Sequence, residues 1–364
     1  MRRRSAKPAR RRTESGFFSG LVGKVVRGLE FFVFALVDVT ARRAYPLAVQ
    51  QTVRSAAEKA ALAARKKKRA KPTKRTTKKP RGRPPGSRNK DKQELKLSSE
   101  LLRINGLLGG LLKLLRVFVR VKYLALDGHF GHRQAVLLAQ QNELHLISKL
   151  RKDAALYEPY AGPYSGRGPR RKYGAKLNYE KLPPHYLQKT EQAGDLRTQY
   201  YQGHFLHPEF GAALNAVLSV KTNAKTQKVG HVILFSSDLA LGWEKLVDYY
   251  SLRFQIEFNF RDAKQHFGLE DFMNTTAVGV ENAANLSFLL VNVSAKLLQN
   301  GDESGGGVLD LKTRFHGLKY ALEAIKILLE KPATIVMPEA VEEVKARISQ
   351  LGRIHQTKAA SSSA

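Results

Sequence analysis

Residues 121–151 have the sequence "VKYLALDGHFGHRQAVLLAQQNELHLISKLR", and this stretch indicates the fold class. Residues 121–127 are an apolar run typical of a short buried strand, which ends at Asp127 before a glycine-bounded turn. Residues 132–142 have the apolar spacing of a helix, and residues 143–151 that of a second strand. Open α/β sheets carry functional groups at the carboxyl ends of their strands, so Asp127 is a candidate site residue.

The segments before this unit continue the pattern. Apolar runs at 28–40 and 44–53, separated by a short connection, predict a β-hairpin. Residues 98–118 predict a helix with Ser98 or Ser99 as its N-cap, because serine at that position accepts a hydrogen bond from the first free backbone N–H groups.

The segments after it add a strand at 231–238 and one long helix that begins within "GWEKLVDYYSLRFQIEFNFRDAKQHFG" (242–268). The alternation predicts an α/β fold with one mixed sheet flanked by helices. Between them, a region rich in Gly, Pro and Tyr predicts an irregular β-rich insertion. The expected divisions are a basic N-terminal segment at 1–28, the first part of the core at 29–153 with a basic disordered insert at 54–97, the β-rich insertion at 154–230, the second part of the core at 231–300, and a helical tail with a disordered end at 301–364.

The composition favours a polyanionic partner. The chain has 364 residues and a formal net charge of +32, from 63 Lys and Arg against 31 Asp and Glu, which favours nucleic acid. It contains no cysteine, which excludes disulfides and cysteine-ligated metal sites. No apolar run reaches the ~18 residues that cross a bilayer, and the basic N-terminus lacks the apolar core of a signal peptide. We expect a soluble cytoplasmic protein, associated with the nucleoid and not with a membrane.

Four polar side chains lie on one arc of the expected long helix. At about 100° per residue, Tyr250, Arg253, Glu257 and Lys264 fall within roughly 60° of one another, between two aromatic flanks. Such an arc offers donors for a phosphate and one carboxylate. The plainer interpretation is an amphipathic surface helix with an ion pair between Arg253 and Glu257.

Asp127 and Glu257 are the two carboxylates that could form one site. Two bare carboxylates about 4 Å apart repel by roughly 4 kcal/mol at an effective dielectric constant of 20, so the pair needs a counterion. Mg²⁺ or Mn²⁺ meets that need and supports phosphodiester chemistry. Alternatively, Asp127 is only a turn residue before Gly128.

Three other polar residues have structural interpretations. Asp238 is expected as the N-cap of the helix that follows it. His129 and His132 lie near Asp127 in sequence, but no third ligand follows at zinc-like spacing, so we interpret them as turn residues.

The spacing Tyr250-x2-Arg253-x3-Glu257-x6-Lys264 resembles the Tyr-Arg-Glu-Lys signature of DDE-class transposases of bacterial insertion sequences. Residues 126–136, "LDGHFGHRQAV", also resemble that family's second-aspartate segment. The resemblance implies a ribonuclease-H-like core and a pair of divalent metals, Mg²⁺ or Mn²⁺. It implies Asp127 as the second acid and Glu257 as the third, both metal ligands, with Tyr250, Arg253 and Lys264 as contacts to DNA.

The same resemblance implies partners and a reaction. The partners would be double-stranded DNA at the element ends and at the target, bound by a homodimer. The reaction would be nicking at the element ends followed by strand transfer during DNA transposition.

The first acid of the family pattern has no clear counterpart. The segment "RGLEFFVFALVDV" (27–39) resembles the family's second strand, and residues 1–20 contain no Asp. Asp38 ends that strand, and a hairpin role suits it better than catalysis. We therefore expect a chain truncated before its first strand, in which the missing first Asp could abolish activity; the alternative is a noncatalytic DNA-binding remnant of a transposase.

The basic tract at 65–92 contains "PRGRPPG" (80–86), in which Arg81 and Arg83 form a core like that of AT-hook peptides. Such peptides place arginines in narrow A·T-rich minor grooves. The alternative is a solvated basic loop that binds the DNA backbone without sequence preference.

Overall fold

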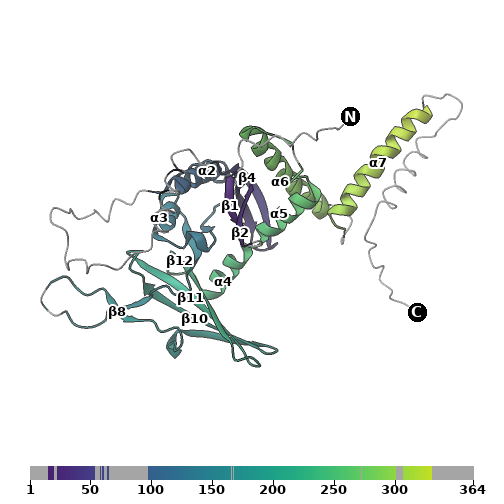
Figure 1. Ribbon diagram of the computed structural model, residues 1–364. Coiled ribbons are helices and arrows are strands. Elements are labelled where there is room, and N and C mark those ends of the chain that lie inside the picture. Colours follow the sequence, from purple (N-terminus) through teal and green to yellow (C-terminus); the bar gives the residue numbers. More distant parts are fainter. Residues whose placement is uncertain are drawn as a thin grey trace, which may run out of the picture. The chain divides into compact units, whose positions relative to one another are not determined.

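The computed structural model of the chain divides into two units (Figure 1). The first comprises residues 1–36, 45–53 and 256–364, and the second comprises 37–44 and 54–255. The residues that the structure describes are 15–19, 23–53, 97–164, 166, 168–271, 273–300 and 306–329, with the single positions 58, 60 and 64. The basic tract with Arg81 and Arg83 and the expected disordered C-terminus lie outside the described residues.

The second unit is built on one eight-stranded sheet, mostly antiparallel (Figure 1). Its strand order is β5-β6-β12-β11-β10-β7-β8, and β9 pairs with β10. The strands are β5 Tyr123–Ala125, β6 His145–Leu150, β7 Tyr157–Pro159, β8 Tyr173–Lys176, β9 Leu187–Ala193, β10 Leu196–Leu206, β11 Ala213–Asn223 and β12 Val229–Ser236. The fold is therefore mixed α/β with several helices.

The predicted strand–helix–strand unit is confirmed. β5 and β6 run parallel and are joined through a 3-10 turn, η1 (Gly128–Phe130), and helix α3 (Arg133–Gln141). The turn lies close against β6, because a Cβ on Gly131 would stand 2.2 Å from the backbone oxygen of Lys149. Only glycine fits there without moving the loop that carries Asp127.

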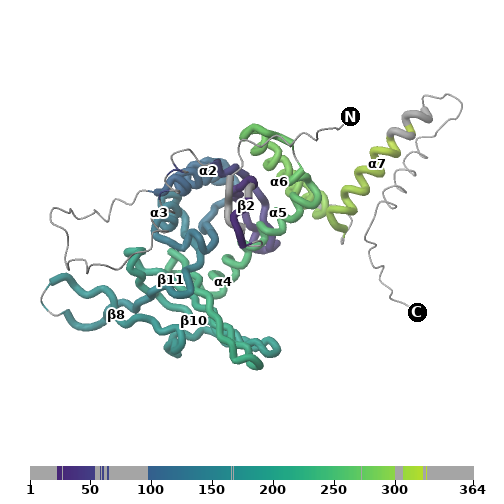
Figure 2. The backbone as a smooth tube through the Cα atoms, in the orientation of Figure 1, coloured from purple at the N-terminus to yellow at the C-terminus, as the bar shows by residue number. Residues whose placement is uncertain are grey.

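The region expected as an irregular insertion contains the longest strands of the sheet. β10 and β11 pair over eleven residues each, and β11 pairs in turn with β12 (Figure 2). Successive residues of β11 are buried, from Leu214 to Leu218, so both of its faces are covered. These strands continue the β5–β6 sheet because β12 pairs directly with β6.

Helix α4 (Trp243–Leu252) covers part of this sheet. Leu246 of the helix packs into a cluster with Ile147, Val217, Leu234 and Leu241. At roughly 25 cal/mol per Å² of apolar surface, burial of this kind is the main force that holds a helix to a sheet.

Helix α2 (Ser99–Leu115) confirms the predicted cap. Ser98 is the N-cap, and its Oγ accepts a hydrogen bond from the Leu101 N–H at 3.3 Å. The buried residues recur every three or four positions, as an amphipathic helix requires: Leu101, Ile104, Leu108 and Leu112.

Within its described residues, the first unit combines two hairpins with three helices. Its elements are β1 Ser15–Ser19, β2 Lys24–Gly28, β3 Phe31–Asp38, β4 Arg43–Gln51, α5 Gln255–His266, α6 Ala277–Asn300 and α7 Val308–Leu329. The end of β3 and the start of β4 are assigned to the second unit. Phe260 of α5 meets Phe288 of α6 edge to face at 5.0 Å. Val33 and Val49 join the same apolar cluster.

Polar side chains of α6 bind the backbone of β4. The Asn285 amide accepts from the Val49 N–H at 3.1 Å and donates to the Val49 oxygen at 2.8 Å. Glu281 accepts from the Gln51 N–H, and Asn292 donates to the Pro46 oxygen. These side chains take the place that a further strand would occupy.

Two expectations about the architecture are wrong. The β3–β4 hairpin forms, but it is a separate two-stranded sheet and not part of one mixed sheet. Side chains of α6 form hydrogen bonds with the backbone of β4 in place of a further strand. The long helix is two helices, α4 and α5, separated by a turn at Arg253 and Phe254. A further hairpin, β1–β2, lies where no regular element was expected.

Asp38 has the hairpin role favoured above. Its Oδ1 accepts a hydrogen bond from the Ala41 N–H at 2.9 Å, in the turn between β3 and β4. Among the helices of the described ranges, none is both long and apolar enough to span a membrane.

Candidate active site

Asp127 lies on an exposed loop just beyond the carboxyl end of β5. Its Oδ1 accepts a hydrogen bond from the His129 N–H at 2.8 Å, and its backbone oxygen accepts one from the Ser148 hydroxyl at 2.7 Å. The carboxylate therefore does cap the turn, as the plainer interpretation held. One carboxylate oxygen has no hydrogen bond or ion pair within the described part of the chain, so the capping role leaves a ligand position open.

Tyr250 and Arg253 lie in the same unit as Asp127, at the carboxyl end of α4. Burial raises the pKa of the Tyr250 phenol, the positive charge of Arg253 lowers it, and the negative charge of Asp127 raises it again. The Arg253 guanidinium carbon stands 5.6 Å from the centre of the Tyr250 ring. The three side chains thus share one electrostatic neighbourhood.

Arg253 has unused hydrogen-bonding capacity. Its Nε is buried and finds no hydrogen-bond partner among the described residues. An unsatisfied buried donor costs about 1–3 kcal/mol. The chemistry of the group suits a phosphate, which a guanidinium binds through two parallel N–H bonds.

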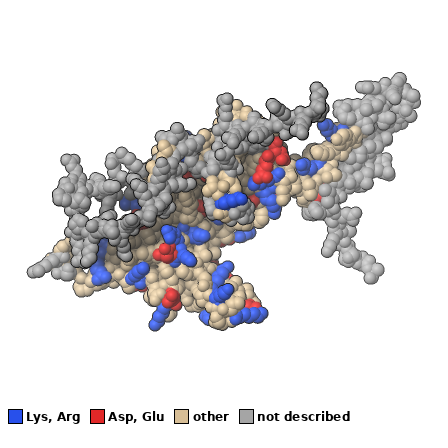
Figure 3. Space-filling view, in the orientation of Figure 1, with Lys and Arg blue, Asp and Glu red and all other residues tan. Residues whose placement is uncertain are grey.

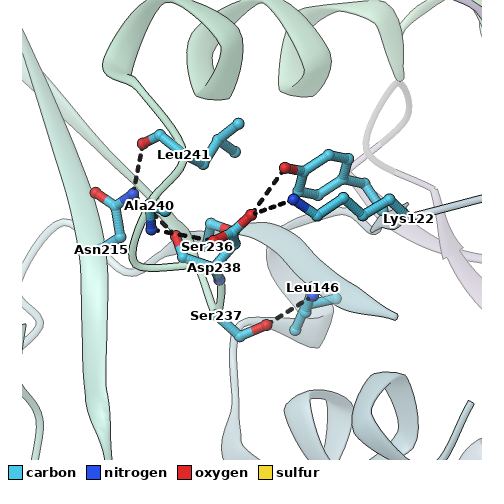
Figure 4. Close-up of polar contacts among 9 residues, drawn as sticks. Lys122, Leu146, Asn215, Ser236, Ser237, Asp238, Ala240 and Leu241 are labelled. Carbon is cyan, nitrogen blue, oxygen red and sulfur yellow. Dashed lines mark hydrogen bonds and ion pairs between the residues drawn. The ribbon is translucent and has the colours of Figure 1, made fainter. Parts of the chain in front are cut away.

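The start of α4 is fixed by Asp238, a residue for which the sequence suggested only a capping role (Figure 4). Gly242, not Asp238, is the N-cap of α4. Asp238 is 7% exposed; its Oδ2 accepts from the Tyr123 hydroxyl at 2.8 Å and lies 3.2 Å from the Lys122 ammonium. Burial raises the pKa of this carboxyl, but these two contacts and a hydrogen bond from the Ala240 N–H outweigh it and hold the pKa below its ordinary value.

Two side-chain amides, of which Asn215 is buried, complete the attachment. The Asn215 side chain of β11 donates to the backbone oxygens of Asp238 and Leu241, at 3.0 and 2.7 Å. Gln202 of β10 donates to the Asn215 side chain and accepts from the Trp243 N–H at 3.1 Å. The connection from β12 to α4 is therefore hydrogen-bonded to the sheet along most of its length, which fixes the origin of the helix that carries Tyr250 and Arg253.

Glu257 and Lys264 belong to the other unit, on α5. Glu257 is exposed and makes no hydrogen bond or ion pair within the ranges that the structure describes. The Lys264 ammonium pairs with Glu270 at 2.6 Å. The structure thus places Tyr250 and Arg253 in the unit that contains Asp127, whereas Glu257 and Lys264, the other half of the expected arc, belong to a separate unit.

Comparison with known protein families decides the classification. Residues 6–203, more than half of the chain, match the family described as DDE superfamily endonuclease. The chain belongs to the DDE superfamily endonucleases. A search of curated proteins finds no match. In this DDE endonuclease the matched residues include Asp127, while the Tyr250–Lys264 signature follows them.

Family membership indicates nuclease-type chemistry, and endonucleases of the DDE type generally use divalent metals. In this DDE endonuclease, no group of three His, Asp or Glu side chains suited to a metal occurs among the described residues. Asp127 nevertheless fits as one ligand, because a carboxylate oxygen is the donor that Mg²⁺ prefers and one oxygen is open.

The histidines of the DDE endonuclease loop also have defined surroundings. The His129 Nε2 lies 3.6 Å from a Glu100 carboxylate oxygen, on α2. Burial, and then the nearby His129, lowers the pKa of His132. Both residues stand in or beside the η1 turn, as the sequence suggested.

Proposed function

We propose that the chain is the catalytic part of a DNA transposase, which cleaves DNA strands and transfers them to a target in a metal-dependent reaction. The observation that carries the proposal is the neighbourhood of Asp127, Tyr250 and Arg253 in a chain of the DDE endonuclease family. A carboxylate with an open oxygen and a guanidinium in the same unit suit a metal-bound phosphodiester. Membership of the family and the spacing of the signature support the same reading.

In this proposal Asp127 and Glu257 are the metal ligands. When bound, Mg²⁺ or Mn²⁺ would activate a water or a 3′-hydroxyl and stabilise the leaving oxygen. Arg253 and Tyr250 would donate hydrogen bonds to a phosphate, and Arg253 would offset its negative charge. Lys264 would act as a third phosphate contact, which requires its ion pair with Glu270 to break. The partners would be duplex DNA at the element ends and the target, bound by a homodimer.

A nicking and strand-transfer assay tests the proposal. The substrate is a duplex that carries the inverted repeats flanking the gene, incubated with Mg²⁺, Mn²⁺ or EDTA. We expect cleavage that requires metal and falls to background in Asp127→Asn and in Glu257→Gln, while both variants still bind the duplex. Glu244→Gln, which removes an exposed carboxylate of α4 outside the candidate site, is the matched control and should cut normally.

Arg253→Ala separates phosphate binding from metal binding. It should weaken binding to the element ends in EDTA, whereas Glu257→Gln should not. Cleavage that continues in both carboxylate variants would contradict the assignment of the ligands. Binding without cleavage under every metal condition would favour the noncatalytic DNA-binding alternative.

A further inference from the structure

A basic hairpin extends from the sheet of the second unit and is separate from the candidate active site. It consists of β7, β8 and the loop between them, residues 157–176, and Figure 1 shows it running out beyond the end of the sheet. Between Glu158 and Glu180 the sequence has no acidic residue, but several Lys, Arg and Tyr. We call residues 157–176 the basic arm.

Aromatic rings and glycines give the arm a defined shape. The Tyr160 N–H donates to the Lys172 oxygen at 3.0 Å, and the Tyr164 hydroxyl donates to the Gly168 oxygen at 2.7 Å. Gly168 has a φ of +75°, a backbone conformation that other residues rarely adopt. A Cβ on Gly162 would stand 2.4 Å from the Tyr160 hydroxyl oxygen, so the Tyr160 side chain lies close over this glycine.

Two arginine side chains of the arm form cation–π contacts with tyrosine rings. The Arg170 guanidinium carbon lies 5.4 Å from the centre of the Tyr164 ring, and that of Arg171 lies 5.0 Å from the Tyr160 ring. Arg171 also donates from Nε to the Tyr173 oxygen at 2.9 Å. A guanidinium over a ring is partly ordered before it binds anything, which lowers the entropy lost when it binds an anion.

The charges of the arm are not neutralised by the protein. Arg170, Arg171 and Lys172 are exposed, and none forms an ion pair with a described residue. Elsewhere on the same sheet, Lys189 pairs with Glu191 at 2.9 Å and Lys225 with Asp195 at 2.6 Å. In the space-filling view blue side chains are prominent on the visible described surface, where red ones are fewer (Figure 3). The arm is thus a run of positioned cations that lacks counterions within the described part of the chain.

We propose that the basic arm binds the phosphate backbone of duplex DNA outside the candidate active site. The inference rests on the proposed function for the identity of the partner. Arginine and lysine bind phosphate oxygens through charge-assisted hydrogen bonds, and each phosphate neutralised releases counterions from the duplex. The arm would therefore add affinity without sequence preference and steady the DNA on the sheet unit while the candidate site acts elsewhere.

The test is equilibrium binding of the full chain to a fluorescent random-sequence duplex in EDTA, from 50 to 300 mM NaCl. The variant Arg170→Gln/Arg171→Gln/Lys172→Gln removes three charges. If each meets one phosphate, the slope of log affinity against log salt becomes shallower by about 2 to 3, and the affinity at 100 mM salt falls at least about tenfold.

The matched control removes three positive charges from the β11–β12 hairpin, whose turn lies at the opposite end of the β10–β11 pair from β7. Lys221→Gln/Lys225→Gln/Lys228→Gln changes the net charge equally and should alter the slope by less than about 1. Arg170→Lys/Arg171→Lys keeps the charge and should retain most of the slope. Circular dichroism melts establish that each variant is folded.

An arm variant with the slope and affinity of the parent chain would overturn the inference, as would a control variant with an equal loss. A parent chain that does not bind the duplex would also overturn it. Because the measurement is made without metal, a chain that binds through the arm but never cleaves DNA would reject the proposed reaction and leave the arm assignment standing.

Discussion

At the scale of single residues, Asp238 shows how a buried charge can fix a functional element. Its carboxylate accepts three hydrogen bonds or ion contacts in a position 7% exposed, and its pKa is lowered. A carboxyl whose folded pKa lies below its unfolded value stabilises the fold above the unfolded pKa. That contribution is lost as the pH falls through the folded pKa, so it fades below about pH 4.

Asp238→Asn should therefore destabilise the second unit by about 1–3 kcal/mol at pH 7, because the charged hydrogen bonds become neutral ones. The difference between the parent and the variant should shrink as the pH is lowered from 5 to 3. Urea unfolding followed by tryptophan fluorescence measures it, since the single tryptophan, Trp243, begins α4 and stacks on Tyr200 at 4.9 Å.

The control for this prediction is Asp153→Asn. Asp153 is exposed and pairs with Arg151 at 3.1 Å on the surface, where ion pairs contribute little. The variant should unfold within about 0.5 kcal/mol of the parent at both pH values. Equal behaviour of the two variants would show that Asp238 does not hold the start of α4.

At the scale of elements, α6 shows how a helix can complete a hairpin. The Asn285 side chain binds both backbone groups of Val49, and it lies in the same stripe as Glu281 and Asn292. A two-stranded hairpin is at best marginally stable alone, so this stripe and the apolar cluster beneath it are what stabilise β3 and β4.

Asn285→Ala should lower the free energy of unfolding of the first unit by about 1–3 kcal/mol, because it leaves the Val49 N–H and oxygen without partners. Hydrogen exchange of the Val49 amide, measured by NMR or mass spectrometry, should accelerate in parallel. Asn282→Ala, on the exposed side of the same helix, is the control and should change stability by less than about 0.5 kcal/mol. Unchanged hydrogen exchange at Val49 in the Asn285 variant would show that the Asn285 side chain does not stabilise β4.

At the scale of the whole molecule, the net charge of +32 predicts that the proposed binding to DNA depends strongly on salt. If the chain contacts about six phosphates, its affinity for a nonspecific duplex should fall roughly a thousandfold between 50 and 200 mM salt. Fluorescence anisotropy over that range measures the effect, and an uncharged crowding agent at equal osmolarity is the control. An affinity that barely changes with salt would mean that the positive charge is not used for binding DNA.

The sequence by itself determined the local elements, and it predicted the class of partner. Ser98 and the apolar spacing after it specified α2, and the strand–helix–strand unit around Asp127 followed from patterns within about thirty residues, because caps, turns and amphipathic faces act over short distances. The charge balance indicated a polyanionic partner, because the net charge can be counted without a folded structure. Sequence patterns also identified the candidate residues Asp127, Tyr250 and Arg253. They did not show that the three residues belong to one unit of the fold.

Only the tertiary structure decided how these pieces combine. It separated the β3–β4 hairpin from the main sheet, joined β10 and β11 to that sheet, and broke the expected helix after Arg253, so that Glu257 lies in another unit. It also gave Asp238 partners on β5, more than a hundred residues away in the chain. These outcomes depend on which backbone and side-chain groups find partners across long sequence separations, and local propensity carries no information about that choice.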